Sequence, residues 1–195
     1  MYLAIVNTMD LEALPLYQNL NTVWSLFVKD LKKIQKYKTI MTSFITPYCI
    51  SAYVICKTAE GPLYLLIRRC GKYLPGTWQM ISGGIENSET APQAAMREIK
   101  EETGLIPYAL YSADAVETFY MQSNDKITFV PVFVAFVEDK KITLSATEHD
   151  AYEWLPFEEA KNKLVWSEQR RVINQIHESC VLKDPSELLR VMIKE

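Results

Sequence analysis

Three glutamates, Glu98, Glu101 and Glu102, recur at helical spacing within a short acidic stretch. At about 100° per residue they occupy an arc of about 100° on one helix face. Like charges three and four residues apart repel each other by about 0.2–0.5 kcal/mol per pair, so the helix itself gains nothing from this arrangement. Clustered carboxylate oxygens suit Mg²⁺ or Mn²⁺, which would convert repulsion into coordination. The spacing therefore predicts a divalent metal site, and a solvent-exposed acidic surface is the alternative.

One turn before these glutamates, the same helix face carries only small residues: Ala91, Ala94 and Ala95. A helix face that merely contacts water more often carries long polar side chains. The alanines therefore predict an open approach to the carboxylates. The residues on the other side of the helix are expected to face the core, and they are Met96, Ile99 and Thr103.

The helix that holds these carboxylates is predicted from about Ala91 to Thr103. Thr90 precedes it as a candidate N-cap, and Gln93 stands where its side chain can reach back to the cap. Gly104 follows the last turn, where a left-handed residue commonly ends a helix.

Strands and further helices are predicted around this helix. Runs rich in β-branched and aromatic residues predict a hairpin, Cys49 to Lys57 and Leu63 to Arg68, and a glycine-rich loop follows from Gly71 to Gly84. The later elements are expected as strands at Ala109 to Met121 and Lys126 to Glu138, then helices at Phe157 to Leu164, Ser167 to about Val181, and after Asp184. This order predicts an α/β fold, a sandwich of helices on a mixed sheet.

The first 40 residues have a different pattern. Apolar residues recur there at helical spacing from Leu20 to Ile34, and lysines crowd the segment from Lys29 to Lys38, which suits the C-terminus of a helix. We therefore predict two parts, a helical N-terminal extension over residues 1–40 and a compact domain over residues 41–195. The extension packs on the domain, forms a homodimer contact or caps a substrate, and the sequence leaves these alternatives open.

The composition excludes several classes of protein. The chain has 195 residues, 49% of them hydrophobic, which suffices for one domain with a sizeable core. A net charge of −3 provides no broad positive field, so duplex nucleic acid is not expected as a partner. No membrane segment is expected either, because the longest uncharged stretch, Ala13 to Val28, is short and contains polar residues. The four cysteines form no C-x-x-C pair, which predicts reduced thiols and a cytoplasmic location.

The acidic stretch is part of a longer pattern. Residues 83–105 resemble the Nudix box at every fixed position, with a glycine, a glutamate, an Arg-Glu pair, a Glu-Glu pair and a second glycine at the required spacing. The matching residues are Gly83, Glu89, Arg97, Glu98, Ile99, Glu101, Glu102, Gly104 and Leu105. The resemblance extends over about residues 45–180 and implies the Nudix fold, an α/β/α sandwich with a mixed β-sheet.

The resemblance also implies an activity. Enzymes of this family hydrolyse the phosphoric anhydride bond of a nucleoside diphosphate linked to another group, a small-molecule substrate, with the help of a divalent metal. The implied ligands of Mg²⁺ or Mn²⁺ are Glu98, Glu101 and Glu102, the last two also catalytic, with the Ser82 carbonyl as a further ligand or substrate contact. The implied supporting residues are Gly83, Glu89 and Arg97, of which the last two tie loop to helix.

A narrower resemblance concerns the substrate. Trp78-Gln79 and residues 89–98 and 147–155 are similar to the bacterial dATP pyrophosphohydrolase branch, whose members also act as dihydroneopterin triphosphate diphosphatases. This resemblance implies hydrolysis of a (deoxy)nucleoside or dihydroneopterin triphosphate to monophosphate and pyrophosphate. It assigns Glu148 to the metal site or to the role of general base, and Arg68 to substrate binding.

Two alternative functions stay open. The pair Glu148-His149 followed by Trp154-Leu155 also resembles the asymmetric diadenosine tetraphosphate hydrolases, and Tyr120 downstream of the box points the same way. A non-catalytic nucleotide-sensing module with the same fold is the other alternative. Such modules usually lose carboxylates of the box, and all of them are present here.

Overall fold

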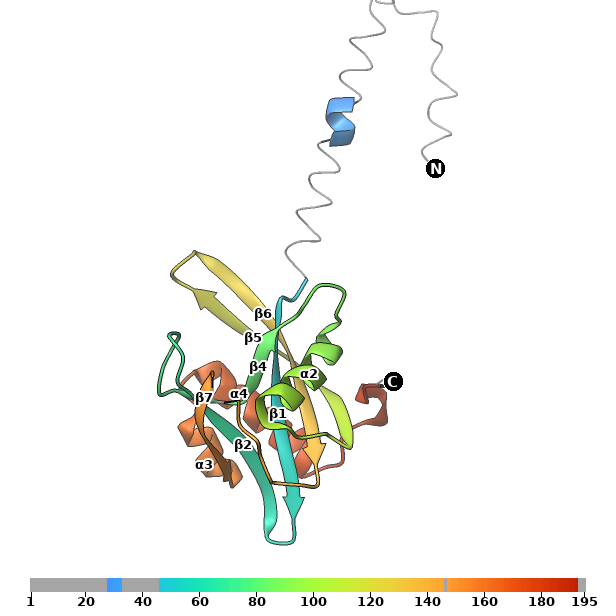
Figure 1. The fold of residues 1–195 in the computed structure, drawn as a ribbon. Coiled ribbons are helices and arrows are strands. Elements are labelled where there is room, and N and C mark those ends of the chain that lie inside the picture. Colours follow the sequence, from blue (N-terminus) through green and yellow to red (C-terminus); the bar gives the residue numbers. More distant parts are fainter. Residues whose placement is uncertain (1–27, 33–45, 146, 193–195) are drawn as a thin grey trace, which may run out of the picture. The chain divides into compact units, whose positions relative to one another are not determined.

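The structure is a computed structural model that describes residues 28–32, 46–145 and 147–192 (Figure 1). The chain divides into two compact units, residues 1–46 and residues 47–195. Within the first unit, residues 28–32 are helical. The rest of the predicted extension over residues 1–40 lies outside the described residues, so the extension stays a prediction.

The second unit is built on a seven-stranded sheet with the central order β3-β2-β1-β6-β5, in which β4 also pairs with β1 and β7 with β2. The strands are β1 (Cys49–Thr58), β2 (Gly61–Arg69), β3 (Trp78–Gln79), β4 (Ile81–Gly84), β5 (Ala109–Met121), β6 (Lys126–Val137) and β7 (His149–Leu155). Strands β1 and β6 run parallel, whereas the other described pairs are antiparallel. The prediction of a mixed sheet is therefore confirmed.

Helices cover both faces of this sheet. They are α2 (Ala91–Thr103), α3 (Phe157–Lys163) and α4 (Ser167–Ile176), with short helical turns at His177–Val181 and Glu187–Leu189. One buried cluster joins α2 to the sheet, and a second joins α3 and α4 to it (Figure 1). The predicted α/β/α sandwich is confirmed. Among the described helices, none is long and apolar enough to cross a membrane.

Strand β1 is the middle strand of this order, and its residues are buried on both faces of the sheet. Ile50, Ala52 and Val54 belong to the cluster under α2. Tyr53 and Ile55 belong to the cluster under α3 and α4. A strand buried on both faces needs a nearly continuous run of apolar and β-branched residues, and this is the pattern that made β1 predictable.

Several shorter elements differ from the prediction. The segment expected as a glycine-rich loop contains β3 and β4, and β7 follows the predicted strands without having been predicted. The last long helix ends at Ile176 and continues as a π-helical turn, His177–Val181. Strands β3 and β7 both pair with β2. Short strands of this kind depend on their partner for structure, since few of their own residues are buried.

The alanines of α2 also differ from their predicted role. Ala94 and Ala95 are fully buried in the core cluster under α2. They let the helix pack closely against the sheet, so the expectation that they form an open approach to the carboxylates is wrong.

Candidate active site

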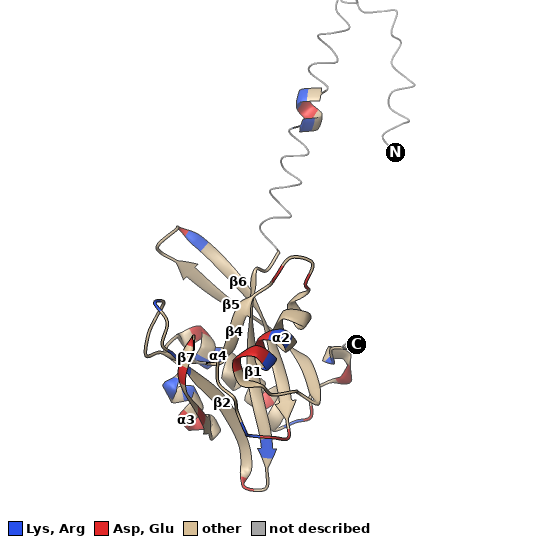
Figure 2. Cartoon of the chain, viewed as in Figure 1, with Lys and Arg blue, Asp and Glu red and all other residues tan. Residues whose placement is uncertain are grey.

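Helix α2 is fixed at both ends by its own sequence. The backbone N–H of Thr90 donates to Gln93 Oε1 at 2.9 Å. Gly104 adopts the left-handed conformation, with φ 73°, and its N–H donates to the Lys100 carbonyl at 2.8 Å. Ile99 of this helix is buried against the sheet, and Figure 2 shows acidic residues on α2.

Glu102 is the most buried of the box glutamates. Only 5% of the residue is exposed, and Oε2 has no hydrogen-bond partner among the described residues. Burial raises the pKa of this carboxyl to about 9, and the negative charges of Glu98 and Glu148 add to the shift, while Arg69 opposes it. A buried carboxyl beside two other carboxylates is a group that a cation would stabilise.

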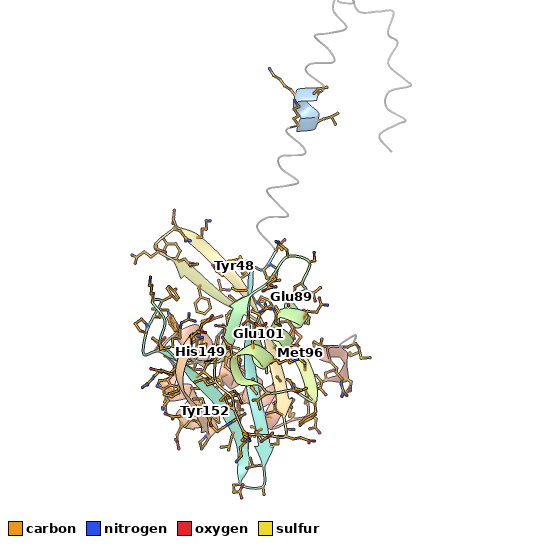
Figure 3. The ribbon with its side chains drawn as sticks, viewed as in Figure 1. Tyr48, Glu89, Met96, Glu101, His149 and Tyr152 are labelled. Carbon is orange, nitrogen blue, oxygen red and sulfur yellow. The ribbon has the colours of Figure 1, made fainter. Side chains whose placement is uncertain are left out.

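Glu148 and His149 meet Glu102 from the start of β7. One ligand atom of each of the three residues lies within 4.8 Å of the others. His149 Nε2 lies 3.9 Å from Glu102 Oε1. His149 is fully buried, and neither ring nitrogen has a partner among the described residues. Burial lowers the pKa of this imidazole, which favours the neutral ring, and a neutral ring can act as a ligand or an acceptor. Figure 3 labels His149 among the side chains of the domain.

Arg97 links the loop before α2 to the other glutamates. Its Nε and Nη2 donate to Glu89 at 3.0 and 2.9 Å, and Nη2 also donates to the Gly84 carbonyl at 2.7 Å. Its Nη1 donates to Glu98 at 2.8 Å and to Glu101 at 3.0 Å. The structure thus brings the predicted supporting pair together and orients two of the predicted ligands with the same guanidinium.

Gly83 lies where β4 approaches the side chain of Glu98 on α2. A Cβ atom at this position would lie 1.9 Å from Glu98 Cδ and 2.0 Å from Oε1. A side chain at position 83 would therefore force the Glu98 carboxylate to move from this position. The neighbouring Ser82 is half-buried, and its Oγ accepts a hydrogen bond from Gln79 Nε2 at 3.2 Å.

A cavity of about 780 Å³ opens beside this cluster. Its lining includes Ser82, Gly83, Glu148 and Arg69, and it also reaches residues of β1, β5 and α4. Arg68, the predicted substrate contact, does not line the cavity and instead pairs with Asp150 at 2.7 Å. Arg68 and Arg69 are consecutive residues of β2, and adjacent side chains of a strand point to opposite faces, so the two have different surroundings.

Sequence reasoning did not identify Arg69 or His149 as site residues. His149 was noticed only as the neighbour of Glu148, because a single histidine next to an acidic residue gives no sign of its burial. Two further lining residues, Glu117 and Gln169, were also not identified. They lie on β5 and α4, outside the box and outside any local motif.

Comparisons with known proteins agree with this geometry. The NUDIX domain family model matches residues 47–176. The dihydroneopterin triphosphate diphosphatase of Escherichia coli K12 is 33% identical over 119 residues, which cover 54% of this chain and 77% of that protein. An octanoyltransferase of Myxococcus xanthus is 32% identical over 119 residues, and there the match covers 57% of this chain and 31% of the relative.

Among solved structures, an Ap4A hydrolase of Caenorhabditis elegans in a binary complex superposes with a TM-score of 0.58 at 24% identity, over 68% of this chain and 96% of that one. This likeness concerns the fold. The family match covers most of the chain and includes the complete box, so the predicted identity is confirmed: the chain belongs to the NUDIX domain family and is a Nudix hydrolase.

Proposed function

We propose that this protein hydrolyses a nucleoside or pteridine triphosphate to the monophosphate and pyrophosphate, with a divalent cation bound at the carboxylate cluster of α2. The observation that carries the proposal is Glu102. It is a buried carboxyl with a free oxygen, and it lies beside Glu148, which lines a cavity large enough for a nucleotide.

The residues present fit a cation such as Mg²⁺ or Mn²⁺. The proposed ligands are Glu98, Glu101, Glu102 and Glu148, with the Ser82 carbonyl as a further oxygen donor. When bound, the metal supplies charge neutralisation for the phosphates and a more acidic bound water. Without that charge, the carboxylates and a triphosphate would repel each other.

The chain's own residues would orient this cluster. Arg97 holds Glu98 and Glu101 in fixed directions, and its pairing with Glu89 fixes the loop that precedes α2. Glu148 is exposed and lines the cavity, so it can reach an attacking water as a general base or serve as a ligand. A Glu148→Gln variant separates these roles, because a lost ligand lowers Mg²⁺ affinity as well as rate, whereas a lost base lowers the rate alone.

The choice of a triphosphate is supported by the similarity to the dihydroneopterin triphosphate diphosphatase of Escherichia coli. The resemblance over residues 147–155 is shared with diadenosine tetraphosphate hydrolases, which makes that reaction the second candidate. A purely sensing role is disfavoured, since all box carboxylates are present and three of them lie on α2.

The test is a metal-dependent substrate screen with the full chain. The substrates are the four dNTPs, dihydroneopterin triphosphate, diadenosine tetraphosphate, ADP-ribose and a nucleotide sugar, and both pyrophosphate and phosphate release are measured. We expect pyrophosphate release from one or more triphosphates that needs Mg²⁺ and is lost in EDTA. Preferred cleavage of diadenosine tetraphosphate would support the second candidate, and binding without hydrolysis of any substrate would support the sensing module.

A further inference from the structure

The cavity contains a second polar group, separate from the box glutamates. Its centre is Glu117 on β5, which is fully buried. Ser51 Oγ donates to one oxygen of this carboxylate at 2.8 Å, and Tyr53 OH donates to the other at 2.9 Å. Burial raises the pKa of Glu117 and the two donated hydrogen bonds oppose the shift. Each carboxylate oxygen accepts one hydrogen bond and keeps a second lone pair, so a further partner that reaches Glu117 from the cavity must be a donor.

Gln169 on α4 adds another acceptor to this group. The residue is 4% exposed, it lines the cavity, and its side-chain Oε1 has no hydrogen-bond partner among the described residues. The single proton of the Tyr53 hydroxyl is shared between Glu117 and the backbone carbonyl of Gln169, which lies 3.2 Å away, so this hydroxyl bridges β5 and α4. A buried carbonyl oxygen without a partner is uncommon in folded proteins and indicates a donor that is missing from the protein alone.

We infer that Glu117 and Gln169 bind the heterocyclic base of the substrate and select a ring with adjacent N–H donors, the 2-amino-4-oxopyrimidine edge shared by guanine and pterins. This inference rests on the proposed function, because it concerns the base of the triphosphate. Ser51 and Tyr53 act as positioning residues that hold the carboxylate toward the cavity.

The chemistry of the other bases disfavours them at this group. Adenine and cytosine each place a ring nitrogen acceptor beside the amino group, and that acceptor would face a carboxylate oxygen. Thymine has one ring N–H between two carbonyls, so it too brings acceptors toward acceptors. A ring N–H next to an exocyclic amino group matches a carboxylate with two donors, and the remaining N–H can reach a second acceptor.

The cavity gives such a ring apolar walls and connects it to the hydrolytic site. Trp166 and Phe119 line it together with Glu117, and aromatic side chains are suitable surfaces for a planar heterocycle. Gly83 and Glu148 line the same cavity. A base at Glu117 and phosphates beside Glu148 would therefore occupy one continuous space.

The first experiment measures kcat/KM with Mg²⁺ for dGTP, dihydroneopterin triphosphate and dATP, using the full chain and its Glu117→Gln variant. Glutamine keeps one acceptor but replaces the other with an N–H donor, which matches adenine better than guanine. We expect kcat/KM for the guanine and pterin substrates to fall at least about tenfold, mainly through KM, while the value for dATP holds or rises. Glu178→Gln, an exposed position outside the cavity, is the matched control.

The second experiment needs neither metal nor turnover. Binding of GMP, neopterin and AMP to the full chain is measured in EDTA through tryptophan fluorescence, since Trp166 lines the cavity. We expect GMP or neopterin to bind more tightly than AMP, and the ratio between these two identifies the natural ring. Gln169→Leu should reduce this preference too, and it decides the outcome if circular dichroism shows that Glu117→Gln does not fold.

The two proposals can fail separately. Equal binding of the three probes, or an unchanged preference in the variants, would overturn the base site even if triphosphates are hydrolysed. A preference for GMP or neopterin without hydrolysis of any triphosphate would support the base site and overturn the proposed reaction.

Discussion

Glu102 combines two properties that oppose each other in the metal-free protein. Its burial stabilises the neutral carboxyl and raises its pKa to about 9, yet a metal ligand must be ionised. The neighbouring charges of Glu98 and Glu148 act in the same direction as burial. Binding of a divalent cation would therefore release a proton at neutral pH and remove the largest electrostatic conflict in this part of the domain.

Replacing this carboxyl tests its role directly. Glu102→Gln keeps the shape of the side chain but removes the charge, and we expect kcat to fall about 10²-fold or more, as for the loss of one contact in a preorganised site. The melting temperature in EDTA at neutral pH should not fall, because glutamine, unlike Glu102, does not have to take up a proton to be buried beside Glu98 and Glu148. Lys100→Gln, an exposed change on the same helix, is the control. Near-normal, metal-dependent hydrolysis by Glu102→Gln would show that α2 is not the catalytic metal site.

The raised pKa of Glu102 also predicts how stability depends on pH. The folded-state pKa of about 9 lies above the reference value of 4.5, so the folded protein binds more protons between these values, and its stability falls as pH rises through this window. The Glu102→Gln variant has no ionisable group at this position, so it does not lose stability in this pH window for this reason. In EDTA, the melting temperature of the wild type minus that of the variant should therefore decrease steadily between about pH 5 and pH 9. A difference that is constant with pH would contradict the assigned pKa.

At the scale of single elements, the end of α2 depends on one glycine. Gly104 has φ 73°, and a Cβ there would make only ordinary contact with Thr143, so the cost of a side chain is conformational. We expect Gly104→Ala to lower the free energy of unfolding by about 1 kcal/mol. Gly71→Ala is the matched control, because Gly71 has no atom within 4 Å of its Cβ position and no positive φ. Equal stability of the two variants in urea unfolding would contradict this explanation.

Elements with a long buried pattern could be predicted from the sequence, and short ones could not. Strand β5 begins and ends at the predicted residues, Ala109 and Met121, and α2 likewise matches its prediction. Strand β4 has four residues, and it is held by pairing with β1 at Ser51↔Ser82 and its neighbours. That pairing is a tertiary contact between segments that are distant in the sequence, so no local periodicity predicts it.

The same distinction holds for the site. The box glutamates lie on one helix, where spacing alone brings them together. Ser51 of β1 and Glu117 of β5 are hydrogen-bonded, and Gln169 of α4 lines the same cavity. These residues are far apart in the sequence, so their spacing does not predict that they lie together. Arg69 was missed for a different reason, because adjacent side chains of a strand point to opposite faces of the sheet, and the arginines alone do not say which of them faces the cavity.

At the scale of the whole domain, β4 connects two layers that the sheet otherwise separates. Gly83 lets this strand approach Glu98 of α2, while Ser82 and Gly83 also line the cavity that reaches Gln169 of α4. The carboxylates from one helical layer and the base-binding residues of the other can therefore act on one substrate. A side chain at position 83 would displace the Glu98 carboxylate.

The boundary of the domain leads to the last prediction. The family match begins at residue 47, and β1 begins at Cys49. Both core clusters of the described residues consist of residues from Ile50 onward. Tyr48, whose hydroxyl lies 3.1 Å from Thr128 Oγ1, lines the cavity. We propose that the compact domain over residues 41–195 is an independent folding unit.

A shortened chain that starts at Met41 keeps Tyr48 and every residue of these clusters. We therefore expect it to fold and to retain kcat/KM within about threefold of the full chain, since truncation tolerance follows the burial of what is removed. Circular dichroism, thermal unfolding and the triphosphate assay check this, and sedimentation of both chains shows whether residues 1–40 contribute to a homodimer. An insoluble product would show that Trp24 and Phe27 belong to the core. A folded product with lost activity would show that the extension completes the substrate site.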